Sequence, residues 1–140
     1  MHPREVHHIG HAIADMDAAV DLYARLLGAV LEHRAVVEDQ GVEAASLRVG
    51  ASRVELLAPL HGDTPVGRFL ARRGPGMHHV AYLVDDIEQA LRDATAAGAE
   101  LIDAAPRRGL FDLRVAFIHP DSAAGVLVEL VQPTMGVSDG

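Results

Sequence analysis

Four side chains of metal-ligating type occur at matching places in the two halves of the sequence. The histidine pair His7-His8 returns as His78-His79, and Glu55, which stands in an apolar run, returns as Glu129. Imidazole nitrogens and carboxylate oxygens bind divalent ions of hard or borderline character. A single histidine or glutamate of this kind is more often structural, but two of each at repeated positions indicate a metal centre.

Composition excludes several other chemistries. The 140 residues contain no cysteine, and all 12 basic residues are arginines. The chain therefore lacks a thiolate nucleophile, a thiolate ligand for zinc or an iron–sulfur cluster, and a lysine that would form a Schiff base. A general base must be a carboxylate, a histidine or, less readily, a tyrosine.

The charge and hydropathy of the chain bear on its partners. A formal net charge of −8 argues against nucleic acid, because phosphate backbones are bound by excess cationic charge. No apolar run is long enough for a signal peptide or a membrane span. We therefore expect a cytoplasmic protein that has neither nucleic acid nor a membrane as its partner.

The sequence contains an internal repeat. Segment 7–16 aligns with segment 78–87, and segment 53–59 aligns with segment 127–133, in both cases without a gap. Each copy begins with an alternating strand, continues with an amphipathic helix and ends with three shorter strands. The repeat predicts two βαβββ modules, at about 5–59 and 77–133, joined by a helix at about 64–73 within a single domain of residues 1–140.

Capping residues and periodicity predict where the elements lie. Asp15 and Asp86 are the expected helix N-caps, and Gly28 and Gly98 stand at the matching C-terminal positions. Thr64-Pro65 is typical of a helix start. We expect strands at 6–13, 30–37, 42–49 and 53–57 in the first copy, and at 77–84, near Leu101, at 113–119 and at 126–132 in the second.

Strand alternation selects one histidine from each pair. The apolar residues around His8 suit the face that packs on the helix, which places His8 on the other face. The same alternation turns His79, Glu55 and Glu129 away from their apolar neighbours. A buried carboxylate is costly unless it is paired or bound to metal. The four residues are therefore the predicted ligands of a divalent ion with two open positions in an octahedral shell.

The paired module resembles the vicinal oxygen chelate superfamily, which includes glyoxalase I, extradiol dioxygenases, antibiotic-resistance proteins and methylmalonyl-CoA epimerases. The resemblance covers nearly the whole chain and is most specific for the epimerases. The runs that carry it are 7–10, 39–42, 55–60, 76–82, 84–87, 117–120 and 125–130, with Gln40-Gly41-Val42 and His119-Pro120 as the most specific elements.

The resemblance implies an α+β fold in which two βαβββ modules form a cupped mixed sheet. It also implies a homodimer and a divalent ion held by His8, Glu55, His79 and Glu129. Cobalt is the first candidate for this ion, and manganese, nickel, zinc and iron are the others. The implied substrate is an acyl-CoA thioester.

The activity that the resemblance implies is the interconversion of the 2R and 2S forms of methylmalonyl-CoA. The α-proton would be removed while the ion stabilises the thioester enolate, and Glu129 is the expected base. Some family members carry a second glutamate where this chain has Ala44, and the nearby carboxylate is Glu43. Alternation turns Glu43 away from the site unless a bulge intervenes, so Glu43 and a single mobile base are both open.

Two other features bear on the substrate. Leu110-Phe111-Asp112 stands where the family often has a small, flexible sequence, which bears on the shape of the acyl pocket. Arginines 72, 73, 107 and 108 are candidates for contacts with coenzyme A phosphates, although each is more typical of a solvated surface charge.

Two further functions are alternatives. A glyoxalase I-like lyase or another metal-dependent isomerase would use the same four ligands. A metal-free binding or resistance protein would need none of them, so metal content distinguishes it. A dioxygenase fits less well, since oxygen activation is typically associated with two histidines and one carboxylate.

Overall fold

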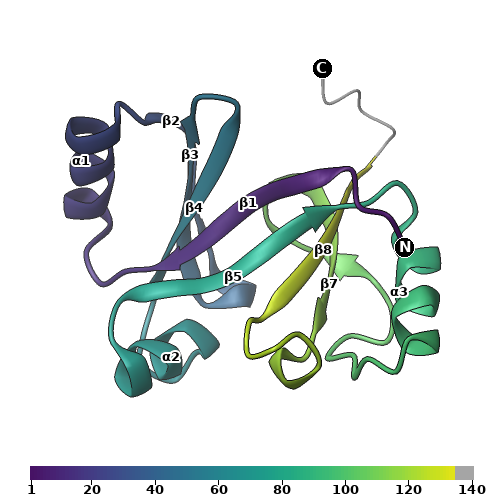
Figure 1. The fold of residues 1–140 in the computed structure, drawn as a ribbon. Helices are drawn as coiled ribbons and strands as arrows, with labels where there is room; N and C mark the ends of the chain where they lie inside the picture. Colours follow the sequence, from purple (N-terminus) through teal and green to yellow (C-terminus); the bar gives the residue numbers. More distant parts are fainter. Residues whose placement is uncertain (135–140) are drawn as a thin grey trace. The chain divides into compact units, whose positions relative to one another are not determined.

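The repeat in the sequence corresponds to a repeated order of elements (Figure 1). The first copy comprises β1 (Glu5–Ala12), α1 (Met16–Leu27), β2 (Val30–Val37), β3 (Val42–Val49) and β4 (Ser52–Pro59). Helix α2 (Pro65–Arg73) follows it. The second copy comprises β5 (Gly76–Leu83), α3 (Ile87–Ala96), β6 (Arg107–Arg108), β7 (Leu113–Ile118) and β8 (Val128–Pro133). Three short 3-10 turns lie at Glu38–Gln40, Leu110–Asp112 and Pro120–Ser122.

The structure is a computed structural model that describes residues 1–134. The chain divides into two compact units. The first unit is residues 8–78, and the second unit is residues 1–7 together with the chain from residue 79 onward. The boundary between the units therefore falls within β1. Residues Glu5 to His7 belong to the second unit, and His8 to Ala12 belong to the first.

In the first unit the strand order is β2-β3-β4-β1. Strands β1 and β4 are parallel, whereas β2–β3 and β3–β4 are antiparallel. Helix α1 packs on one face of these strands, where Met16 and Ala19 meet Ala45, Leu47 and Leu56 in a buried cluster. The opposite face is left for the residues of the other parity.

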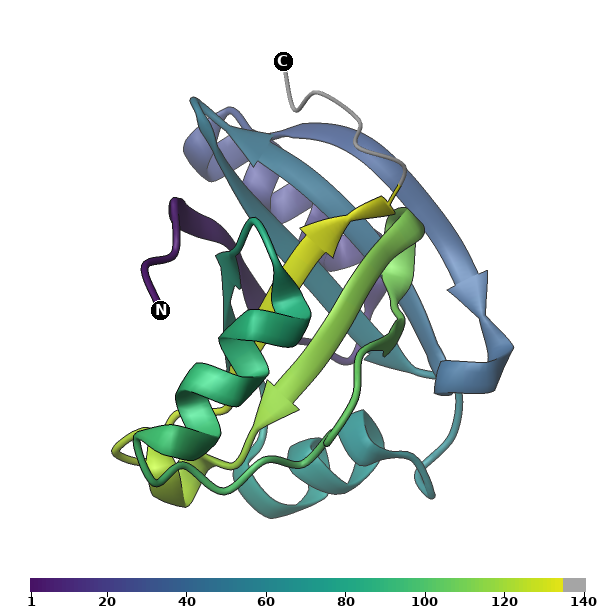
Figure 2. The same cartoon turned by 90° about the vertical axis from the view of Figure 1, so that its right-hand side faces the viewer.

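The second unit repeats this arrangement with the order β5-β8-β7-β6. Strands β5 and β8 are parallel, and β8–β7 and β7–β6 are antiparallel. Figure 2 shows α3 beside β7 and β8, and its buried residues Ile87 and Leu91 pack there with Ala116, Ile118 and Leu130. Both units are therefore mixed sheets covered on one face by a helix.

The helices begin and end where the sequence predicts. The carboxylates of Asp15 and Asp86 each accept a hydrogen bond at 3.1 Å from the backbone N–H three residues later. Gly28 ends α1 with a φ of 65°, a left-handed conformation that favours glycine. Thr64 caps α2 through its hydroxyl, which accepts from Gly67 N at 3.0 Å.

One predicted strand is wrong. Leu101 forms a single isolated bridge with Ile118, and the strand of this part of the module is the two-residue β6 at Arg107–Arg108. Between Leu101 and β6, the backbone N–H of Ile102 donates to Phe117 O at 2.9 Å, and the Asp103 carboxylate accepts from Phe117 N at 2.8 Å in place of a backbone carbonyl, so no regular ladder joins Leu101 to β6. The other strands lie within two residues of their predicted ends. Within residues 1–134, no helix is long and apolar enough to cross a membrane.

Candidate metal centre

In the first unit, His8 and Glu55 form a buried pair. His8 is 3% exposed and Glu55 is 6% exposed, and 3.6 Å separates His8 Nε2 from Glu55 Oε2. In the parallel pairing of β1 with β4, Gly10 lies opposite Glu55. His8 stands two residues before Gly10 on the same strand, so its side chain lies on the same face as that of Glu55.

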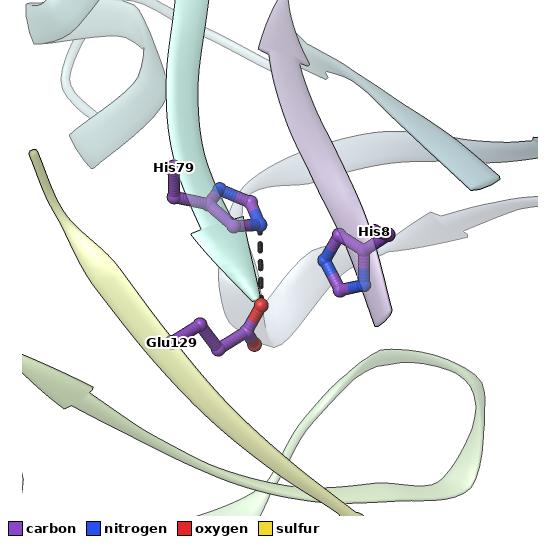
Figure 3. A group of neighbouring side chains, drawn as sticks. All are labelled: His8, His79 and Glu129. Atoms are coloured by element: carbon purple, nitrogen blue, oxygen red, sulfur yellow. Dashed lines mark ion pairs between the residues drawn. The ribbon is translucent and has the colours of Figure 1, made fainter. Parts of the chain in front are cut away.

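In the second unit, His79 and Glu129 form the equivalent pair (Figure 3). His79 is 2% exposed and Glu129 is 7% exposed, and 3.1 Å separates His79 Nε2 from Glu129 Oε1. Strand β5 sets Ala81 opposite Glu129, again two residues after the histidine. The two units thus place their histidine and glutamate in the same register.

Burial agrees with the parity argument. His8 and His79 are buried, whereas His7 and His78 are only half-buried. The apolar neighbours of the two glutamates, Leu56 and Leu130, belong to the helix-covered cores. One detail differs, since Ile9, expected on the helix-packed face, is 36% exposed.

Small side chains lie on the same faces as the ligand candidates. Gly10 and Ala12 share the face of His8 on β1, and Ala44 shares the face of Glu55 because it opposes Leu57 on β4. Ala12 and Ala44 are completely buried, as is Ala81 on β5. Small residues therefore line the faces that carry the two His–Glu pairs.

Glu43 lies on the face of β3 opposite to that of Glu55. The β3–β4 pairing runs without a shift from Val42 to Val49, so no bulge turns Glu43 back. Its Oε2 lies 2.8 Å from Arg34 Nε, and Arg34 also pairs with Asp17 at 2.7 Å. The hydrogen bond with Glu43 is the main cause of a raised pKa for the exposed Arg34. The carboxylate of Glu43 is therefore engaged away from Glu55.

The arginines proposed for coenzyme A contacts are exposed and mostly engaged within the chain. Arg73 lies over the ring of Phe69, with 5.7 Å from its Cζ to the ring centroid. Arg107 pairs with Asp103 at 3.2 Å, and Arg108 pairs with Asp112. No contact on these residues identifies a phosphate site.

His11 is a titratable group of β1 outside the donor set. Its Nδ1 lies 2.7 Å from the hydroxyl oxygen of Tyr23 on α1, on the helix side of the strand. Burial lowers the pKa of His11 and raises the pKa of Tyr23, because it disfavours the charged form of each. The hydrogen bond therefore joins two neutral groups at neutral pH, and His11 connects β1 to α1.

The donor chemistry fits a divalent ion. Each unit supplies one buried imidazole nitrogen and one buried carboxylate, and the latter is costly to bury without a positive partner. Nitrogen and oxygen donors of this kind suit cobalt, manganese, nickel, zinc or iron, whereas a thiolate-selective site would need cysteine. Each unit thus supplies one nitrogen donor and one oxygen donor.

Two residues on these faces were missed by the sequence analysis. Phe117 on β7 opposes Glu129, and Ser46 on β3 opposes Glu55. Ser46 is 7% exposed, and Phe117 lies edge-on to His79. The repeat contained a usable signal, because both residues lie on the strand that precedes and pairs with the glutamate strand.

Comparisons with known proteins agree with this arrangement. Residues 7–117 match the glyoxalase/bleomycin resistance protein/dioxygenase superfamily. The Bacillus subtilis (strain 168) protein YqjC is 38% identical over 126 residues, which are 90% of this chain and 90% of YqjC.

Two solved structures give the same result. The methylmalonyl-CoA epimerase from Mycobacterium tuberculosis is 37% identical with a TM-score of 0.89, and the match covers 94% of this chain and 89% of that one. A variant of the Streptomyces coelicolor methylmalonyl-CoA epimerase, in complex with 2-nitronate-propionyl-CoA, is 36% identical with a TM-score of 0.92, and the match covers 98% and 99%. The predicted resemblance and the α+β class of two βαβββ modules are confirmed.

Proposed function

The chain belongs to the glyoxalase/bleomycin resistance protein/dioxygenase superfamily, and on that premise we propose that it interconverts the 2R and 2S forms of methylmalonyl-CoA. The observation that carries the proposal is the equal register of the two buried His–Glu pairs, in a chain 37% identical to a methylmalonyl-CoA epimerase. We propose that His8, Glu55, His79 and Glu129 together hold one divalent ion, with cobalt as the first candidate.

Each proposed ligand has a defined task. A divalent ion bound to this set would act as a Lewis acid and stabilise negative charge that develops on a substrate oxygen. His8 and His79 would bind it through Nε2, the ring nitrogen that faces the glutamate within each unit. Glu55 and Glu129 supply two negative charges. They would balance the charge of the ion.

Glu129 is the proposed base. The α-carbon of methylmalonyl-CoA lies between a thioester and a carboxylate, so its proton is acidic enough for a carboxylate to remove. Glu129 would take this proton from one face, and as a mobile base it would return the proton to the other face after the planar carbon and the carboxyl group have changed their relative orientation. Since Glu43 is paired with Arg34 on the far side of β3, we propose that Glu129 serves both faces.

The substrate class follows from the same comparison. The similar Streptomyces coelicolor enzyme binds 2-nitronate-propionyl-CoA, which supports an acyl-CoA thioester as substrate here. The homodimer implied by the sequence resemblance stays a prediction, and the identity of the ion is part of the proposal.

Exchange of the α-proton with solvent tests the function. We expect protein loaded with cobalt or manganese to exchange the α-proton of methylmalonyl-CoA with deuterated water, as followed by mass spectrometry. Propionyl-CoA lacks the free carboxylate and is the matched control, for which we expect much slower exchange. Fully metallated protein that exchanges neither substrate would contradict the epimerase proposal.

The same assay distinguishes the alternative functions. Conversion of the hemithioacetal of methylglyoxal and glutathione, without exchange of methylmalonyl-CoA, would indicate a glyoxalase I-like enzyme. Protein that binds no divalent ion, measured by elemental analysis after loading and desalting, would indicate a binding protein.

A further inference from the structure

Phe117 is the side chain that packs against the proposed ligand His79. Their ring centroids are 6.0 Å apart and the ring planes meet at 87°, an edge-to-face arrangement. Phe117 stands directly opposite Glu129 in the β7–β8 pairing, so it shares the face of the His79–Glu129 pair. The phenylalanine therefore contacts one member of the pair and is in register with the other.

Phe117 is itself held by two neighbours in the second unit. Its backbone N–H donates to Asp103 Oδ2 at 2.8 Å, and Asp103 Oδ1 pairs with Arg107 Nε at 3.2 Å. The guanidinium of Arg107 lies over the phenylalanine ring, with 5.5 Å from Cζ to the centroid. Asp103 thus fixes both the backbone of Phe117 and the cation that covers its ring.

In the first unit a different residue stands opposite the glutamate. The residue opposite Glu55 is Ser46, where the second unit has Phe117 opposite Glu129. The His–Glu separation is 3.6 Å in the first unit and 3.1 Å in the second. The two His–Glu pairs are therefore alike in register but differ in the residue that stands opposite the glutamate.

We propose that Phe117 is a positioning residue that fixes the ring plane of His79, so that the second unit's half of the donor set is preorganised for the ion. This inference rests on the proposed metal centre. A ligand whose rotamer is locked by packing loses less freedom on binding, and residues that orient a ligand typically change metal affinity by about 10- to 100-fold when substituted.

Metal affinity of a Phe117→Leu variant tests the inference. We expect cobalt binding, measured by competition with a chromophoric chelator, to weaken about tenfold, and the visible absorption of bound Co²⁺ to change because the geometry at His79 relaxes. Phe117→Tyr keeps the ring, so we expect it to retain the affinity of the unsubstituted protein.

The chain offers a matched control. Phe69 lies edge-on to His78, at 5.0 Å and 72°, and is covered by Arg73. His78 is not among the proposed ligands, so Phe69→Leu removes the same kind of contact without touching a ligand. We expect its cobalt affinity to stay within about twofold of the unsubstituted protein, because no proposed ligand loses a contact. The Co²⁺ spectrum of this variant should also stay unchanged.

The outcomes separate the two proposals. If the unsubstituted protein binds no cobalt, the metal centre fails. If it binds cobalt and Phe117→Leu binds it equally well with an unchanged spectrum, the positioning role of Phe117 fails. Should Phe117→Leu not fold, Arg107→Gln at an exposed position removes the ring's cover, and unchanged cobalt affinity in that variant would likewise overturn the inference.

Discussion

At the scale of single residues, parity decides which side chains can act together. His8 and Glu55 share a face in the first unit, and His79 and Glu129 share a face in the second. Glu43 is also a glutamate of this sheet, but it opposes Ala58 and so lies on the other face from Glu55. The next residue, Ala44, opposes Leu57 and shares the face of Glu55. A shift of one residue along β3 therefore decides whether a side chain faces Glu55 or the exposed Arg34.

Glu129→Gln tests the proposed base. A glutamine keeps an oxygen that can bind metal but accepts no proton at neutral pH, so we expect α-proton exchange at saturating cobalt to fall by about 100-fold or more. The measurement is deuterium incorporation into methylmalonyl-CoA with bound cobalt quantified in the same sample. An unchanged rate in the metallated variant would remove Glu129 from the role of base.

The same substitution at Glu43 separates the two candidate bases. Because Glu43 pairs with Arg34 away from Glu55, we expect Glu43→Gln to lose much less exchange activity than Glu129→Gln. A loss of equal size in the two variants would restore Glu43 as a second base. Strand alternation in the sequence already turns Glu43 away from the site, but only the unshifted β3–β4 pairing excludes a bulge that would turn it back.

At the scale of elements, local signals predicted most of the fold. Asp15, Asp86 and Gly28 act through bonds within one turn of their helices, so sequence spacing was sufficient to locate those ends. The strand near Leu101 was wrong because a periodicity argument does not foresee that the Asp103 carboxylate accepts from the Phe117 N–H, which a regular ladder would use. Phe117 was not singled out because its contact with His79 depends on the pairing of three strands.

The turn between β6 and β7 depends on a glycine for steric reasons. Gly109 has an ordinary φ of −105°, but a Cβ at this position would lie 2.6 Å from Val115 Cγ1 and 2.8 Å from Val115 Cγ2. Val115 is 2% exposed and has little space to move. We expect Gly109→Ala to lower the free energy of unfolding by about 1–3 kcal/mol, measured by urea denaturation.

Gly62→Ala is the control for this substitution. A Cβ at Gly62 meets no atom within 4 Å, so we expect the free energy of unfolding to change by no more than about 0.5 kcal/mol. If both variants lose the same amount, the cost is not steric and the close approach of Gly109 to Val115 is not what shapes the turn.

At the scale of the whole molecule, net charge and site charge differ in their consequences. The chain carries a formal charge of −8, which would repel an anionic acyl-CoA at long range. Within the proposed centre, two carboxylates and one divalent cation sum to zero when both histidines are neutral. The average charge therefore does not exclude an anionic substrate, but it predicts that binding strengthens as added salt screens the repulsion.

Metal stoichiometry tests whether both units serve one centre. We expect one cobalt ion per chain, and we expect His8→Ala and His79→Ala each to weaken its binding at least about tenfold, because each removes one of four ligands. Two independent sites would instead bind two ions, and each variant would lose only one of them.

Cobalt at about 100 times its dissociation constant should also stabilise the folded protein by about 2.7 kcal/mol, measured by urea denaturation. Stabilisation that is undiminished in either histidine variant at the same cobalt concentration would show that the ion is held elsewhere.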